Sequence, residues 1–223
     1  MPEPTGVIFD MDGILVLTEE PHWQSWLAVA VPRGVTLDYD TFLSCFGRVN
    51  DDCFPILFGD VDREEMDRVA EEKEQAFRDI IREDVPLAPG TRELLAELKA
   101  AGVKLAVGSS GPRENVDLVL DSGRIREYFG AVVTGNDVTN GKPAPDAFLL
   151  AANRLNVPVD RCAVVEDAPP GIEAARAAGM LAVGVTTTHT ADQLRGAGAN
   201  HLFKHLADLA SGTLLGLIEQ QER

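Results

Sequence analysis

From about residue 86 to the end of the chain, short apolar runs alternate with stretches in which hydrophobic positions recur every three or four residues. Apolar runs rich in β-branched residues are typical of buried strands, and the longer periodic stretches are typical of amphipathic helices. We therefore expect strands at 104–107, 131–134, 162–166 and 181–185, and a weaker one at 200–203. Helices are expected at 91–101, 113–121, 145–155, 171–178 and 191–197, with a terminal helix at 205–218.

Residues 17–85 show helical periodicity without a convincing strand. The pattern predicts helices near 21–30, 39–45, 51–58 and 62–82, the last strongly charged but with one apolar stripe. Alternating strands and helices with short loops predict a parallel sheet covered by helices on both faces. We expect an α/β fold: a doubly wound, Rossmann-like core from 1–16 and 86–223, with a small all-helical cap domain inserted at 17–85.

The balance of charges narrows the range of partners. The 223 residues contain 36 acidic and 20 basic side chains, a net charge of −16, which disfavours nucleic acids and anionic membrane surfaces. An anionic substrate would then need a local positive site.

Three scattered cysteines, Cys45, Cys53 and Cys162, form no metal-binding pattern and indicate free thiols in a reducing compartment. The N-terminus lacks the features of a signal peptide, and no run of about 20 apolar residues could span a bilayer. We expect a cytoplasmic protein that is a monomer or weak homodimer.

The apolar run that begins at Val7 ends in two aspartates, Asp10 and Asp12, followed by Gly13. Two carboxylates at i and i+2 of a strand would share one face and could not both ionise cheaply, so a divalent cation between them is the natural partner. Gly13 would let the backbone turn sharply next to a ligand. Without further motifs, the two aspartates could equally cap a turn.

Three further segments carry polar groups at expected strand ends. Ser109, Ser110 and Gly111 precede a helix start, where hydroxyls and free backbone N–H groups suit a phosphate. Lys142 stands in a loop stiffened by prolines, and the adjacent acids Glu166 and Asp167 end another apolar strand, where they would be costly without a cation.

These four segments, in this order, resemble the four motifs of the haloacid dehalogenase superfamily of phosphoryl-transfer enzymes, specifically the branch that contains β-phosphoglucomutase and related phosphatases. The similarity covers essentially the whole chain, and Ala168 is a departure because serine is usual there. It implies a Mg²⁺-dependent enzyme in which Asp10 is the nucleophile, Asp12 the general acid and base, and Ser109 and Lys142 contact the phosphoryl group. The metal would be held by Asp10, Asp12 through its backbone carbonyl, Asp167 and, directly or through water, Glu166.

The same resemblance assigns His22 and Lys73 of the helical block to substrate binding, together with Gly13, Ser110 and Gly111. His22 could tune Asp12 or simply pack at the interface. Trp23 and Trp26 are expected to form cap core or lid, and glycines near the cap boundary with 86–89 to form a hinge.

Three functions remain open from the sequence. The family mutase has an arginine that binds a second phosphate, but Asn50 occupies that position here and Arg48 lies two residues away. We therefore favour a phosphatase acting on a small phosphorylated metabolite, a phosphomonoester for which a sugar phosphate is one candidate. A sugar-phosphate mutase is the alternative, with Arg48 as a candidate anchor. A non-catalytic phosphate-binding regulator fits less well, since a binder needs no acid or base such as Asp12.

Overall fold

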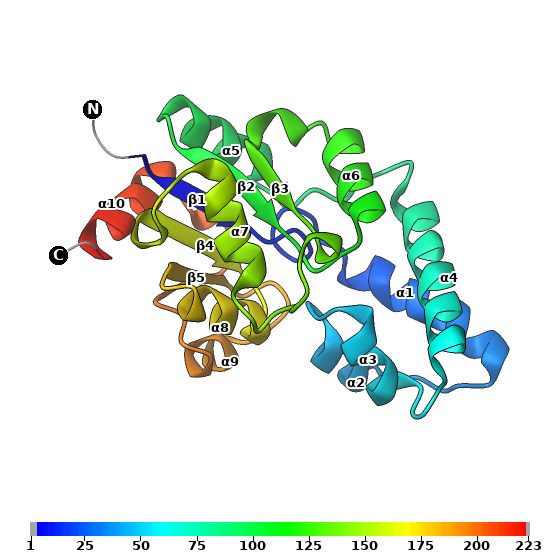
Figure 1. Cartoon of the computed structure of the whole chain (residues 1–223). Coiled ribbons are helices and arrows are strands. Elements are labelled where there is room, and N and C mark those ends of the chain that lie inside the picture. The colour runs from blue at the N-terminus through cyan, green and yellow to red at the C-terminus, as the bar shows by residue number, and fades with distance from the viewer. Residues whose placement is uncertain (1–3, 222–223) are drawn as a thin grey trace.

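The structure, a computed structural model, describes residues 4–221 (Figure 1). Within that range β1 (Gly6–Phe9), β2 (Lys104–Gly108), β3 (Ala131–Val133), β4 (Cys162–Glu166), β5 (Leu181–Val185) and β6 (His201–Phe203) form one six-stranded sheet. Neighbouring strands are parallel, in the order β3-β2-β1-β4-β5-β6. This confirms the doubly wound α/β fold. Residues 1–3 and 222–223, at the ends of the expected core segments, lie outside the described residues.

Both faces of the sheet are covered, because successive strand side chains point to opposite sides. On β1, Val7 and Phe9 belong to one buried cluster and Ile8 to another. The first cluster includes residues of α5 (Thr91–Ala100), α6 (Arg113–Ser122) and α10 (Ser211–Gln221). The second includes residues of α7 (Asp146–Leu155), α8 (Pro169–Ala177) and α9 (Ala191–Gly196), many of them alanines.

The four remaining α-helices of the described chain, α1 (Glu19–Ala30), α2 (Tyr39–Cys45), α3 (Asn50–Leu57) and α4 (Arg63–Ile81), gather beside the sheet (Figure 1). They share an apolar cluster of their own, which contains Trp26, Phe42, Phe54 and Val69. We call residues 17–85 the cap. As expected, these residues form no strand.

The chain enters and leaves the cap at one place. The Leu17 N–H donates to the Pro86 carbonyl at 2.8 Å, and Val16 pairs with Leu87 in an antiparallel bridge. The two crossing segments are therefore tied together next to the sheet. The division into core and cap domains, and a hinge at this crossing, stay predictions.

Three expected helices differ from the structure. The terminal helix expected at 205–218 is wrong in its first part, because His205 and Asp208 cap a short 3₁₀ helix over Leu206–Asp208 and α10 begins only at Ser211. Helix α8 begins at Pro169 rather than residue 171, and α1 begins at Glu19, two residues before the expected start. Proline in a first helical turn lacks only a donor that would have no partner there, so both helices extend past their prolines.

Among the residues that the structure describes, no helix is both long and apolar enough to cross a membrane.

Candidate active site

The carboxyl edge of the sheet brings together the polar residues that follow β1, β2 and β4. Asp10 comes directly after β1, Ser109 after β2, and Glu166 and Asp167 at the end of β4. β1 lies between β2 and β4 in the sheet, so these residues meet although the chain separates them widely.

Lys142 joins this group from the loop before α7. Its ammonium, 2% exposed, donates to Asp10 Oδ1 at 2.6 Å and to Glu166 Oε1 at 2.7 Å. The other oxygen of Glu166 accepts from the backbone N–H groups of Asp167 and Ala168, each at 2.8 Å. Glu166 is thereby fixed, and it holds Lys142 against Asp10. Gly171 leaves room for this carboxylate, because a Cβ there would lie 1.7 Å from Glu166 Oε1.

Asp10, Glu166 and Asp167 form a buried group whose carboxylate oxygens lie within 4.8 Å of one another. Burial raises the pKa of Asp10 to about 7 even though Lys142 opposes the change, and burial together with the charges of Glu166 and Asp10 raises the pKa of Asp167. Three carboxylates around one ammonium carry more negative charge than the ammonium can balance. The set therefore fits a divalent cation, which prefers oxygen ligands.

Gly13 and Thr188 fix the position of Asp167. Gly13 has φ +82°, and a Cβ there would lie 1.9 Å from Asp167 Oδ2, so only glycine lets the first motif approach this carboxylate. The Thr188 hydroxyl donates to the same oxygen, and Thr187 donates to the Gly13 carbonyl at 2.6 Å.

The Asp12 carboxylate contacts residues of the cap, and the strand spacing that placed it on one face with Asp10 does not apply. β1 ends at Phe9, so the two aspartates are not alternate residues of one strand. Asp12 Oδ1 instead accepts from Thr18 Oγ1 at 2.5 Å and lies 3.2 Å from His22 Nε2. Burial raises the pKa of Asp12, but the attraction of His22 and the hydrogen bonds from His22 and Thr18 outweigh it and lower the pKa overall.

The three residues of the loop after β2 make different hydrogen bonds. Ser109 is buried, and its oxygen accepts from the Gly111 N–H at 3.0 Å, which leaves its own hydroxyl proton free to donate toward the cavity. Ser110 donates to the Gly47 carbonyl of the cap at 3.1 Å. Ser110 thus ties core to cap, and the amide of Gly111 is already engaged.

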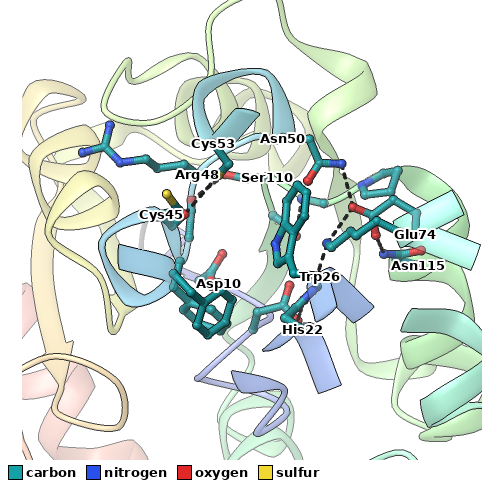
Figure 2. Close-up of a pocket in the computed structure, with 18 residues that line it drawn as sticks. Asp10, His22, Trp26, Cys45, Arg48, Asn50, Cys53, Glu74, Ser110 and Asn115 are labelled. Carbon is teal, nitrogen blue, oxygen red and sulfur yellow. Dashed lines mark hydrogen bonds and ion pairs between the residues drawn. The ribbon is translucent and has the colours of Figure 1, made fainter. Parts of the chain in front are cut away.

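One cavity lies between this edge and the cap (Figure 2), lined by Asp10, Asp12, His22, Trp26, Lys73 and Ser109 among others. Its volume of about 70 Å³ is well below the roughly 300 Å³ of a pocket that holds a whole ligand. As expected, Trp23 and Trp26 pack in the cap core, and Trp26 also faces the cavity.

Cap residues of the cavity wall contact one another in a series that begins next to Asp12. Lys73 Nζ lies 3.1 Å from His22 Nδ1, and the His22 ring stacks on Phe77 with centroids 4.0 Å apart. Because ammonium can only donate, the single proton of a neutral His22 ring lies on Nε2, facing Asp12. Figure 2 shows the Arg48 guanidinium on the opposite side of the cavity from Asn50 and Glu74.

Four residues in this region were not expected from the sequence: Thr18, Glu74, Asn115 and Thr188. Thr188 could have been predicted from the sequence, because hydroxyl residues that follow β5 reach the same sheet edge as Ser109. The other three gave none, since they depend on how cap helices dock onto the core.

The chain is similar to known proteins over most of its length. A family model described as haloacid dehalogenase-like hydrolase matches residues 7–185. A phosphorylated carbohydrates phosphatase from Thermotoga maritima is 35% identical over 180 residues, covering 78% of this chain and 82% of that protein. A fructose-1-phosphate phosphatase from Escherichia coli is 36% identical over 186 residues, covering 81% of this chain and 95% of that protein.

A solved structure agrees with the sequence comparisons. The crystal structure of a β-phosphoglucomutase from Clostridium difficile superposes with a TM-score of 0.89 at 28% identity, covering 97% of this chain and 98% of that one. Similar proteins therefore include both phosphatases and a mutase.

Proposed function

Since the chain belongs to the haloacid dehalogenase-like hydrolase family and is a phosphoric monoester hydrolase, we propose that it hydrolyses a small sugar phosphate with Mg²⁺ and an aspartyl-phosphate intermediate. The observation that supports this most directly is the contact of 2.6 Å between Lys142 and Asp10 at the floor of the cavity. It places a cation beside the carboxylate that would attack phosphorus.

In this proposal Asp10 attacks the phosphorus atom and displaces the leaving alkoxide, and water then cleaves the aspartyl-phosphate. Lys142 offsets the negative charge that builds up on the phosphoryl oxygens, and Glu166 keeps its ammonium in place. The hydroxyl proton of Ser109 is free to donate to a phosphoryl oxygen. Positioning and charge carry most of the catalysis, as in other phosphoryl transfers.

Asp12, oriented by His22, would handle the proton of the leaving group. The lowered pKa keeps resting Asp12 ionised, which suits a base that activates water. To act first as an acid, Asp12 would take up a proton from solvent, and the Nε2–H of His22 at 3.2 Å would stay on the ring and orient the Asp12 carboxylate by a hydrogen bond. Lys73, in contact with His22 Nδ1, holds the ring in that orientation.

Asp10 and Asp167, with the backbone carbonyl of Asp12, would hold Mg²⁺. Both oxygens of Glu166 already accept hydrogen bonds, so Glu166 would act through Lys142 or through a water molecule. When bound, the ion would neutralise the phosphate and the clustered carboxylates.

A phosphatase is favoured over a mutase by the far side of the cavity. A mutase must hold both ends of a bisphosphate while excluding water. Asn50 donates to Glu74 at 2.8 Å there, and the Arg48 guanidinium lies on the opposite side. The mutase stays the second candidate because a β-phosphoglucomutase shares the fold at a TM-score of 0.89.

A screen of phosphorylated metabolites for Mg²⁺-dependent phosphate release, run beside an assay of glucose 1-phosphate to glucose 6-phosphate isomerisation, tests the proposal. We expect phosphate release that EDTA stops, that Asp10→Asn abolishes and that the exposed control Asp60→Asn leaves unchanged. Isomerisation faster than phosphate release would establish the mutase instead. Tight phosphate binding without turnover would indicate a regulator.

We further propose that the protein works in the cytoplasm, since its three cysteines are free thiols. We also propose that it is a monomer or weak homodimer. Size-exclusion chromatography with light scattering would test the oligomeric state.

A further inference from the structure

Glu74 lies on a wall between two cavities. The inner cavity contains Asp10 and Asp12, and a much larger outer cleft of about 800 Å³ opens beside it. Both are lined by Asn50, Glu74, Ser110 and Pro112. The part of a leaving group that the inner cavity does not hold would therefore lie next to this wall.

Side chains of both cap and core hold the Glu74 carboxylate (Figure 2). Oε1 accepts from Asn50 Nδ2 and Lys73 Nζ, each at 2.8 Å. Oε2 accepts from Asn115 Nδ2 of α6 at 2.5 Å, and Arg78 donates to Asn115 Oδ1 at 3.1 Å, which fixes the orientation of that amide. The Glu74 side chain is only 7% exposed, so it is a fixed negative group rather than a mobile surface charge.

The outer cleft offers no spare cation for an anionic group. Among its described lining residues, Arg63 pairs with Asp51 and Asp67, and Arg78 pairs with Glu71. Lys142 is engaged with Asp10 and Glu166. Asp52 and Glu114 add further negative charge to the lining. A second phosphate on the substrate would thus find no unpaired cation in this cleft and would lie near its acidic side chains.

We propose that Glu74, held by Asn50 and Asn115, is a specificity-determining residue that admits an uncharged, hydroxyl-rich leaving group and rejects a second phosphate. A hydroxyl can donate to the carboxylate or accept from either amide, whereas a phosphate dianion has no proton to donate and would compete with the carboxylate for the donors that already hold it. This inference rests on the proposed function and specifies the substrate class of the same site.

The test compares one sugar with and without the second charge. kcat/KM is measured with Mg²⁺ for fructose 1-phosphate and fructose 1,6-bisphosphate, and p-nitrophenyl phosphate reports the core chemistry alone. We expect the monophosphate to be preferred by roughly 100-fold or more, because opposed like charges cost several kcal/mol. If p-nitrophenyl phosphate and both sugars are left intact, the phosphatase proposal fails. If the enzyme is active but uses both sugars equally well, only the inference fails.

Two variants assign the preference to Glu74. Glu74→Gln should reduce the monophosphate preference at least about tenfold, and the ratio within one preparation does not depend on the folded fraction. Asn50→Arg keeps the buried carboxylate and adds a second cation beside it, so it should reduce the preference in the same direction. Glu72→Gln removes the same charge from the same helix at a 47% exposed side chain paired with Arg33, and should leave the ratio unchanged. An unchanged ratio in both test variants overturns the proposal.

Discussion

In the floor of the cavity and in its cap wall, the pKa values of buried carboxylates are shifted in opposite directions. At the floor, one ammonium contacts Asp10 and Glu166 while Asp167 lies close to both carboxylates, and burial raises the pKa of Asp10 to about 7. In the wall, burial also opposes ionisation of Glu74, but Lys73, His22 and the Asn50 amide lower its pKa to about 2. The floor is left in need of a cation, while the wall is complete without one. This difference is the reason that we propose the metal and the phosphate chemistry at the floor and substrate recognition at the wall.

Lys142→Met would break the floor most severely. Removing one partner of a buried ion pair costs about 3–5 kcal/mol of unfolding free energy, because Asp10 and Glu166 lose their only ammonium. Turnover should fall by roughly 10²–10³-fold as well. Urea unfolding at pH 7.5 without metal checks the first expectation and phosphate release the second. The exposed control Lys204→Met should stay within about 0.5 kcal/mol of the parent. Equal stability of the two variants would mean that Lys142 does not offset the floor carboxylates.

Asp12→Asn tests the junction between floor and wall. The amide keeps the shape of the side chain and can still accept from Thr18, but it cannot carry a proton to or from the substrate. We expect kcat to fall by roughly 10²–10⁴-fold with little change in melting temperature. Steady-state kinetics and a thermal melt measure these. Unchanged turnover would assign the acid–base role to another group.

The two regions should respond to pH with opposite signs. A folded-state pKa above the ordinary value makes ionisation of Asp10 unfavourable to folding, so metal-free protein should lose about 4 kcal/mol as pH rises from about 4 to 7. The depressed pKa of Glu74 stabilises the fold above pH about 4.5, and that contribution disappears as pH falls towards about 2. Urea unfolding across this pH range in EDTA measures both limbs.

Addition of Mg²⁺ and the substitution Asp10→Asn give two further tests of this pH dependence. Adding Mg²⁺ should stabilise the protein more at pH 7.5 than at pH 5, because the ion binds ionised carboxylates. Asp10→Asn should make the limb between pH 4 and 7 shallower, with the raised pKa of Asp167 still contributing to it, and should leave the acid limb of Glu74 in place. Stability that rises between pH 4 and 7 without metal would contradict the raised pKa of Asp10.

Of the four predictions, the substitution Thr188→Val should have the smallest effect. It removes the hydroxyl that orients Asp167, so the Mg²⁺ concentration for half-maximal activity should rise about tenfold while kcat at saturating Mg²⁺ changes little. Thr186→Val is the matched control, because Thr186 contacts the Phe203 carbonyl instead. An identical Mg²⁺ dependence in both variants would remove Thr188 from the metal site.

The sequence determined the floor because one general rule connects it to the fold. Apolar runs at β1, β2 and β4 identified parallel strands, and the carboxyl ends of parallel strands meet at one edge, which put Asp10, Ser109 and Asp167 together. Each motif is local, so a few adjacent residues carry the whole signal. Glycine at position 13 likewise follows from a close approach that only its missing Cβ permits.

Only the tertiary structure decided the partners of Asp12 and the wall around Glu74. Spacing suggested that Asp12 faces Asp10, but the strand stops at Phe9, and the carboxylate accepts from Thr18 and lies beside His22 instead. Glu74 meets Asn50, 24 residues away, and Asn115, 41 residues away. Those contacts depend on the angle at which cap helices dock onto the core. Helical periodicity identifies the buried face of a helix, but it contains no information about which residue lies opposite.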